Sequence, residues 1–201
     1  MARLLKGEKS NQRPSRDAQE TRTRILGAAK LRFCKHSYEQ VGVREIAGDA
    51  NVDAAMVNRY FGTKEELFAE AAKGVFNAEN FIEGPPGKLG EYLARRLVHG
   101  SGGESKGGSG INPFELLLRS AASPTASPII AQRLHTDFVL RLAALIGGRH
   151  AAMRAALVAS YIIGFLTVRI ALQSPAIGPA CVDEAAALLG SAIQSAIDEL
   201  K

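Results

Sequence analysis

The stretch from Val43 to Phe61, VREIAGDANVDAAMVNRYF, decides how this chain of 201 residues folds. It meets, in order, the steric demands of two short helices joined by a tight turn. Ala47 is small enough for the second helix to cross closely, and Asn51 suits a turn residue because Asn tolerates positive φ. Asp53 is a residue type that caps a following helix by accepting a bond from a free backbone N–H. The spacing therefore predicts a helix-turn-helix over this stretch.

A helix-turn-helix places its second helix, here residues 54–61, in the major groove of DNA. Asn and Arg side chains pair with adenine and guanine edges, and Ala or Met can touch a thymine methyl. The same polar groups can instead hold phosphates, which position a protein without specifying a sequence. Charge suits Arg44 and Lys64 to phosphates, whereas Tyr60 suits either a phosphate or the core. The candidate DNA-binding residues are Arg44, Ala54, Ala55, Met56, Asn58, Arg59, Tyr60 and Lys64.

The positive charge of the chain is concentrated near the helix-turn-helix. The formal net charge is +5, and residues 1–62 carry all of it, with 12 Lys and Arg against 7 Asp and Glu. Residues 63–201 hold equal numbers of each sign. This asymmetry favours a nucleic-acid or anionic-membrane contact confined to the first third of the chain. A basic tail that only aids solubility would give the same total.

Apolar periodicity elsewhere is helical, and no segment alternates with period two between turn signals. We therefore expect an all-α protein of about nine helices. Thr63 and Glu66 form the capping-box pattern that starts a new helix. The expected parts are a flexible basic arm (1–16), a DNA-binding domain (17–62), a connecting helix (63–80), and a helical ligand-binding and dimerisation domain (81–201) with a flexible Gly- and Ser-rich loop (101–110).

Several classes of protein and of site are disfavoured. Cys34 and Cys181 lie far apart, which argues against a disulfide scaffold and a cysteine zinc site. Four scattered histidines and a Gly tract without the P-loop ending predict no catalytic residue, no metal site and no cofactor. The start of the chain lacks the apolar run of a signal peptide. The longest uncharged apolar stretch, Ala155–Val168, is shorter than the roughly 20 residues that cross a bilayer. We expect a cytoplasmic protein with no membrane partner.

The last two long helices are rich in small residues, among them Ala155, Ala159, Ala186 and Gly190, which allow close backbone approach. Paired across a two-fold axis they would form a four-helix bundle, and so predict a homodimer; packing inside one monomer is the alternative. Polar residues within apolar helices are the only signals for a ligand pocket, although such residues are more often structural or ion-paired. The candidates are Arg119, His135, Asp137, Tyr161 and Arg169.

Three segments together resemble the tetracycline-repressor (TetR) family. They are Thr21–Leu26 with Ala28 and Ala29, Val43–Ala47, and Asn58–Phe68 with the sequence NRYFGTKEELF. The resemblance implies a three-helix DNA-binding head joined through a fourth helix to an all-α body that binds ligands and dimerises. It also implies a homodimer that usually represses transcription and leaves DNA when a small molecule binds.

The chain departs from the family pattern at several positions. Ser37 and Asn51 stand where the family usually has Gly, Gly42 lacks the usual Thr or Ser side chain, Asp53 replaces Ser, and Asn58 replaces an aromatic residue. These changes leave the fold plausible. They put the family's phosphate contacts at positions 42 and 58 in question, and Asp53 places an anion near the DNA.

The leading hypothesis is a dimeric, sequence-specific DNA-binding regulator that recognises a palindromic double-stranded operator. A small apolar effector would release it by favouring a spacing of the two recognition helices that no longer fits adjacent grooves. Two alternatives belong to other classes of protein. One is a helical protein-interaction module whose basic head binds acidic partners, and the other is a small-molecule enzyme that uses the pocket of the body.

Overall fold

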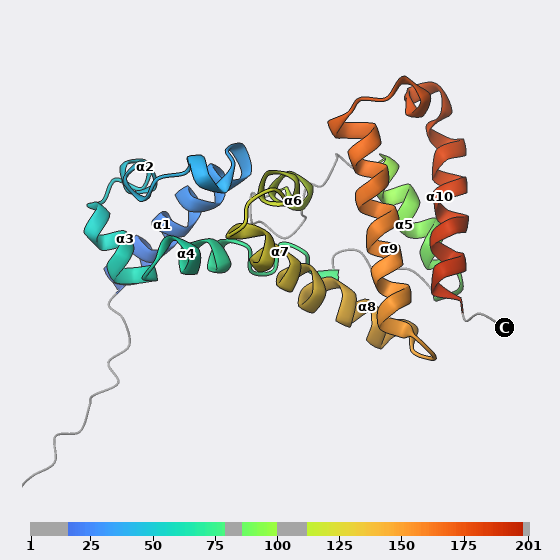
Figure 1. Cartoon of the computed structure of the whole chain (residues 1–201), viewed down its shortest axis with the longest axis horizontal. Coiled ribbons are helices and arrows are strands. Elements are labelled where there is room, and N and C mark those ends of the chain that lie inside the picture. The colour runs from blue at the N-terminus through green and yellow to red at the C-terminus, as the bar shows by residue number, and fades with distance from the viewer. Residues whose placement is uncertain (1–15, 79–85, 100–111, 199–201) are drawn as a thin grey trace, which may run out of the picture.

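The computed structural model describes residues 16–78, 86–99 and 112–198, and every regular element in these ranges is helical. The expected all-α class is confirmed. A head made of the first four helices lies at one end of the molecule, and α6 and α7 lie between it and the remaining helices (Figure 1). The predicted arm, apart from Arg16, and the predicted loop at 101–110 lie outside the described residues.

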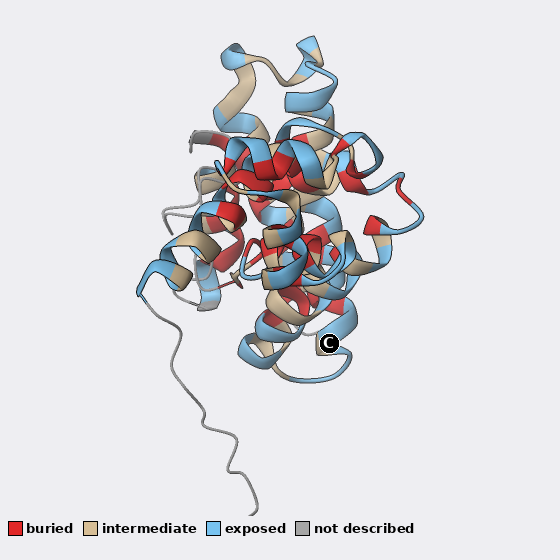
Figure 2. Cartoon of the chain, turned by 90° about the vertical axis from the view of Figure 1, so that its left-hand side faces the viewer, coloured by how far each residue is buried: buried red, intermediate tan, exposed pale blue. Residues whose placement is uncertain are grey.

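The head has one shared core. Its elements are α1 (Arg16–Lys35), the 3₁₀ turn η1 (Tyr38–Gln40), α2 (Val43–Asp49), α3 (Ala54–Phe61) and α4 (Lys64–Ala71). Each of the four helices buries large apolar side chains completely, represented by Phe33, Ile46, Val57 and Phe68. Buried residues occupy the inner faces of these helices and exposed residues the outer faces (Figure 2). Each such side chain contributes about 1.5–3 kcal/mol by leaving water, so the head is held together as a unit.

The connecting helix begins as predicted but is shorter than the expected range of 63–80. The Thr63 hydroxyl accepts from the Glu66 backbone N–H at 3.2 Å, and the Glu66 carboxylate accepts from the Thr63 N–H at 2.8 Å. This confirms the capping box. α4 ends at Ala71, and the chain then turns through Gly74, whose φ of +69° lies in the left-handed region that favours glycine.

The rest of the described chain forms the body. Its main elements are α5 (Leu89–His99), α6 (Pro113–Ser120), α7 (Ala126–Leu134), the π-helical turn η4 (His135–Val139), α8 (Leu140–Ile146), α9 (Ala151–Leu166), the π-helical turn η5 (Thr167–Ala171) and α10 (Val182–Ile197). Short 3₁₀ turns precede α5 (η3, Pro86–Lys88) and α10 (η6, Pro175–Ile177, and η7, Pro179–Cys181). Because α7, η4 and α8 run on without a break, the ten α-helical segments of the described ranges make nine helices.

Helices α5 and α10 approach each other through two glycines, Gly90 and Gly190. A Cβ atom built on Gly90 would lie only 2.5 Å from the backbone N of Gln194, which is closer than real Cβ contacts come. The Gly90 N–H donates to the Gln194 side chain at 2.9 Å across the same contact. Backbone packs against backbone here, so Gly90 leaves no room for a Cβ, and a Cβ on Gly190 would press on the α5 backbone at 3.1 Å.

Arg154 holds together the ends of three helices. Its guanidinium is 4% exposed and donates to the carbonyl oxygens of Gly147 (3.2 Å), Arg149 (3.0 Å), Ala196 (3.2 Å) and Ile197 (2.7 Å). Carbonyl groups at a helix C-terminus have no partner within the helix, and a cation suits that end of the helix dipole. Arg154 of α9 therefore fixes the end of α10 against the α8–α9 connection.

Small residues expected at a dimer interface are instead used inside the monomer. Ala186 and Gly190 of α10 face α5, and Ala155 and Ala159 of α9 are buried. Their small size allows neighbouring helices of the same chain to pack closely. The sequence identified residues that favour close packing but did not show which helix they would meet.

We predict that Gly90→Ala destabilises the protein, because the added methyl has to push α5 and α10 apart. Overpacking of this kind costs about 1–3 kcal/mol. The matched control is Gly27→Ala in α1, where an added Cβ meets nothing within 4 Å and higher helix propensity stabilises by about 0.5–1 kcal/mol. Urea denaturation measures both free energies of unfolding. Equal changes in the two variants would contradict the tight glycine contact.

Candidate nucleic-acid interface and effector pocket

The turn between α2 and α3 has the geometry that its sequence predicts. Asn51 has a φ of +51°, and the Val52 N–H donates to the Ala47 carbonyl at 3.0 Å, which closes the turn. The Asp53 carboxylate accepts from the Ala55 N–H at 2.8 Å and so caps α3. Ala47 is 3% exposed. The roles predicted for Asn51, Asp53 and Ala47 are confirmed.

In the first turn of α2, Glu45 compensates for the capping side chain that Gly42 lacks. Gly42 has no side chain with which to cap α2, but its backbone N–H donates to the Glu45 carboxylate at 2.9 Å. One free backbone donor at this helix start is therefore satisfied. A phosphate contact from a side chain at this position remains absent.

One face of α3 is buried in the head and the other is open to solvent. Val57 and Phe61, four residues apart, pack inward. Ala55, Asn58 and Arg59 are exposed, as is Arg44 on α2. The other candidates, Ala54, Met56, Tyr60 and Lys64, are half-buried, and Ala54 and Tyr60 pack against the core. The outward face of α3 is therefore centred on Ala55 and Arg59.

Lys64 is held in place by an aromatic ring that the sequence analysis did not single out. Its ammonium nitrogen lies 4.1 Å from the centre of the Tyr38 ring, a cation–π contact. The Tyr38 hydroxyl donates to Glu65 at 2.8 Å. Burial, and then this bond to the carboxylate, raise the pKa of Tyr38 well above its usual value. The first turn of α4 thus presents a positioned cation next to the end of α3.

Ion pairs neutralise some of the charges in the head. The Arg32 guanidinium forms two bonds to Asp49, at 2.5 and 2.9 Å, and lies 3.5 Å from Glu45. Arg22 pairs with Glu70 at 3.0 Å. Among the described residues, no salt bridge involves Arg44 or Arg59. The charges of these two residues remain available to an anionic partner.

The body contains an apolar cavity of about 80 Å³ that is partly open to solvent. Its lining comes from α5, α6, the α7–η4 helix and α9, together with Phe76 beyond α4. It includes Leu97, Phe114, Leu134, Phe138, Ile162 and Leu166, and every lining side chain is apolar. Its apolar lining and its place between helices are features that small-molecule sites share. It has no side chain suited to pairing with a charged ligand.

The five residues predicted to form the ligand pocket do not line this cavity. Arg119 and His135 are exposed, and Tyr161 is 40% exposed. Asp137 accepts from the Gly74 N–H at 3.3 Å, and Arg169 donates to the Val98 carbonyl at 2.8 Å. Their sequence neighbours Leu134, Phe138 and Ile162 do line the cavity. Adjacent residues on a helix point about 100° apart, so a polar residue next to a lining residue faces elsewhere.

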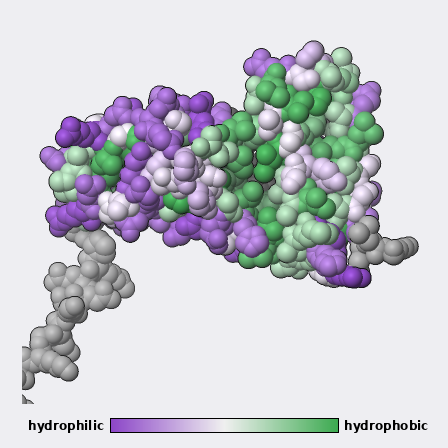
Figure 3. Space-filling view, viewed as in Figure 1, coloured by the Kyte–Doolittle hydropathy of each residue, from purple (hydrophilic) through white to green (hydrophobic). Residues whose placement is uncertain are grey.

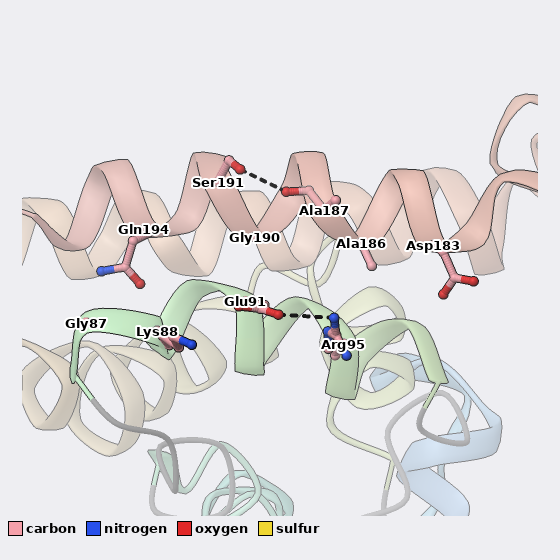
Figure 4. A pocket seen from close by; sticks show the side chains of 10 residues that line it. All are labelled: Gly87, Lys88, Glu91, Arg95, Asp183, Ala186, Ala187, Gly190, Ser191 and Gln194. Carbon is pink, nitrogen blue, oxygen red and sulfur yellow. Dashed lines mark hydrogen bonds and ion pairs between the residues drawn. The ribbon is translucent and has the colours of Figure 1, made fainter.

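A larger groove of about 610 Å³ runs along the outside of α5 and α10 (Figure 4). Its walls carry Lys88, Glu91, Arg95 and Asp183, and Glu91 pairs with Arg95 at 3.1 Å. Both signs of charge face this groove, and the tight contact between the two helices lies beside it. The apolar cavity is therefore the better candidate for an effector site, because burying an apolar ligand there desolvates no charge.

Two family models match the chain. One, described as bacterial regulatory proteins of the tetR family, matches residues 25–71 and so includes the helix-turn-helix. The other, described as the C-terminal domain of tetracyclin repressor-like proteins, matches residues 88–197, more than half of the chain. No curated relative matches the chain.

Several solved structures share the fold. A TetR-family regulator from Streptomyces coelicolor is 24% identical, with a TM-score of 0.55 over 94% of this chain and 100% of that one. NalD from Pseudomonas aeruginosa, the secondary repressor of a multidrug efflux pump, is 18% identical, with a TM-score of 0.56 over 90% and 97%. The multidrug binding protein EbrR, complexed with proflavin, is 21% identical, with a TM-score of 0.56 over 86% and 99%. At these identities the likeness establishes the fold alone.

Proposed function

The chain belongs to the TetR family of DNA-binding transcriptional regulators, and we propose that it is a homodimeric repressor released from its operator by a small, uncharged, apolar molecule. It acts in the cytoplasm by binding, without catalysis. The observation that carries the release mechanism is the apolar cavity in the body, because the helix that carries Leu134 and Phe138 of its lining also contacts α4 of the DNA-binding head through Arg133. The family as a whole consists of regulators that bind DNA operators and small-molecule effectors.

In the proposed complex, α3 enters the major groove. Asn58 pairs with an adenine and Arg59 with a guanine, because both side chains are exposed and present the matching hydrogen-bonding groups. Ala54, Ala55 and Met56 are apolar candidates for a thymine methyl. Phosphate contacts come from the remaining candidates, which are Arg44, Tyr60 and Lys64.

The proposed dimer interface is an exposed apolar stripe on α9 and its extension. Met153, Leu157, Tyr161, Val168 and Leu172 are between 37% and 69% exposed and recur at spacings of four to seven residues. Figure 3 shows a hydrophilic head and a hydrophobic face over the body helices, α9 among them. Exposed apolar patches of this extent mark interaction sites, and a second copy of the same face can cover one symmetrically.

Two helices of the body are also long and apolar enough, by length and composition, to cross a membrane. They are Ala151–Ala171 and Pro179–Ile197, and 28% and 22% of their most apolar windows are buried. The first helix is longer than the uncharged stretch Ala155–Val168, because it continues past Arg154 at one end and Arg169 at the other. We assign both helices to the folded body, because Arg154 of the first helix is bonded to four of its carbonyl groups, and the proposed dimer would cover the exposed apolar face of that helix.

The effector is proposed to be uncharged because the cavity lining contains no charged side chain. EbrR has been solved with proflavin, an aromatic dye that is cationic at neutral pH. A cation in the present cavity would lose its hydration without gaining a counter-charge, which is costly in an apolar interior. This protein should therefore discriminate against such dyes.

Selection of bound sequences from random duplex DNA tests the regulator. The expected product is a palindrome with half-sites about one helical turn apart. Arg59→Ala and Asn58→Ala should each weaken binding to it by roughly 30-fold or more and relax the preference at one base pair in each half-site, because the dimer loses two bidentate base contacts worth about 1–3 kcal/mol each. Arg24→Ala, an exposed cation on α1, serves as a control. Absence of any selected sequence would contradict the proposal.

Sedimentation velocity tests the dimer. The wild type should sediment with a mass twice the 21.4 kDa of one chain. Leu157→Glu should sediment as a monomer, because a dimer of this variant would bury two uncompensated carboxylates in its interface. The matched control is Leu31→Glu on α1, where the leucine is 52% exposed against 43% for Leu157. A monomeric wild type, or a Leu157→Glu variant that stays dimeric, would contradict this interface.

A further inference from the structure

The helix that lines the apolar cavity also holds the DNA-binding head. Leu134 and Phe138, at the end of α7 and in η4, contribute to the cavity wall. The residues immediately before them, Arg133 and Asp137, reach in a different direction and contact the segment around α4. Two cavity residues therefore alternate with two residues that contact α4 and the turn after it, all within six consecutive residues.

One contact satisfies a backbone group in the last turn of α4, and the other satisfies a backbone group in the turn that follows this helix. The Arg133 guanidinium donates to the Ala69 carbonyl at 3.3 Å, and an Asp137 carboxylate oxygen accepts from the Gly74 N–H at 3.3 Å. Ala69 is in the last turn of α4, where carbonyl groups lack partners within the helix. The other Asp137 oxygen lies 2.9 Å from the Thr136 hydroxyl, whose single proton it shares with the Gln132 carbonyl at 3.0 Å.

The cavity is too small for an ordinary ligand to enter without moving its walls. Its volume of about 80 Å³ compares with roughly 300–1,000 Å³ for typical small-molecule sites. The wall that carries Phe138 is a π-helical turn, a local departure from α-helical hydrogen bonding that is common at functional sites. Displacement of Phe138 would also displace Asp137, its neighbour in the chain.

The head cannot absorb a movement of α4 without moving itself. α4 has eight residues, about 12 Å of helix, and its first turn follows α3 directly through Gly62. Phe68 of α4 packs edge-on against Phe33 and Tyr38 of the head, with ring centres 4.9 and 5.2 Å apart. A displacement at the end of α4 is therefore carried to α3.

A second head contact lies near the opposite end of α7. The buried Ser123 hydroxyl, which accepts from the Ala126 N–H in the first turn of α7, donates to the Glu39 carboxylate at 2.5 Å. This bond lowers the pKa of Glu39. The head is thus attached near both ends of α7, and of these two contacts the one at the π-helical turn adjoins the cavity wall. Helix α6, which packs against α1 of the head, also lines the cavity, through Pro113, Phe114 and Leu117. The Ser123–Glu39 contact can serve as a pivot.

We propose that Arg133 and Asp137 are positioning residues that couple occupancy of the cavity to the orientation of the head. Neither touches ligand or DNA. An effector that displaces Leu134 and Phe138 moves Arg133 and Asp137, which shift the end of α4 and turn the recognition helix about the Ser123–Glu39 contact. This inference rests on the proposed function, because it assigns the residues through which an effector would release DNA.

The test compares Asp137→Ala, Arg133→Ala and Asp137→Asn with the wild type. Gln132→Ala, an exposed neighbour on α7, is the matched control. The effector probe is N-phenyl-1-naphthylamine, a neutral aromatic amine whose fluorescence rises in apolar surroundings. Probe affinity is measured by this fluorescence, and affinity for the selected operator by anisotropy with and without saturating probe. The ratio of the two operator affinities is the coupling factor.

For the wild type and Gln132→Ala we expect a coupling factor of roughly 5- to 150-fold. Asp137→Ala and Arg133→Ala should reduce it several-fold toward one, while probe affinity and operator affinity without probe change by less than about threefold. Asp137→Asn should retain the factor, because its amide oxygen can still accept from the Gly74 N–H. Thermal melting establishes that each variant is folded. If Asp137→Ala is unfolded, the coupling factor of Arg133→Ala is compared with that of the wild type instead.

A coupling factor as large in Asp137→Ala and Arg133→Ala as in the wild type would overturn the inference and leave the proposed function intact. Loss of coupling in Asp137→Asn equal to that in Asp137→Ala would also overturn it, because the hydrogen bond would then not be responsible. A wild type that binds both probe and operator with a factor of one would overturn the proposed function as well.

Discussion

Phe68 of α4 packs edge-on against Phe33 and Tyr38, and this contact determines how movement of the connecting helix reaches the DNA-binding head. The three rings come from α4, α1 and η1, and they make the connecting helix part of the DNA-binding head. Edge-on aromatic pairs add about 0.5–1.5 kcal/mol each to the free energy of burial. The same Tyr38 holds Lys64 at the start of α4. Whatever moves α4 therefore moves the recognition helix and a cation beside it.

The ion pairs show which of the positive charges in the head are neutralised and which remain exposed. Arg22 and Arg32 are engaged by Glu70, Asp49 and Glu45, and their charges tie α1 to α4 and α2. The charge that remains on the outer face of the head belongs to side chains such as Arg44 and Arg59. Long-range attraction to DNA comes from total charge, whereas a choice of sequence has to come from these few positioned groups.

The head could be predicted from the sequence because its determinants are local. The positive φ of Asn51, the cap from Asp53 and the Thr63–Glu66 box each depend on residues within a few positions of one another. The cavity could not be predicted, because its lining depends on which face of each helix meets another helix. Gly190 indicated close packing but not the partner α5, and Asp137 indicated a polar function but not the contact with Gly74.

A distance between spin labels in the dimer measures most directly whether the effector changes the spacing of the two recognition helices. Gly48→Cys offers an exposed site on α2 where a side chain meets nothing within 4 Å. Cys181→Ser removes the half-buried thiol, and burial, which raises the pKa of Cys34 to about 11, keeps that thiol unreactive. Pulsed electron paramagnetic resonance should give a label distance that shifts by several ångströms with saturating N-phenyl-1-naphthylamine. An unchanged distance at probe concentrations that release the operator would contradict the account.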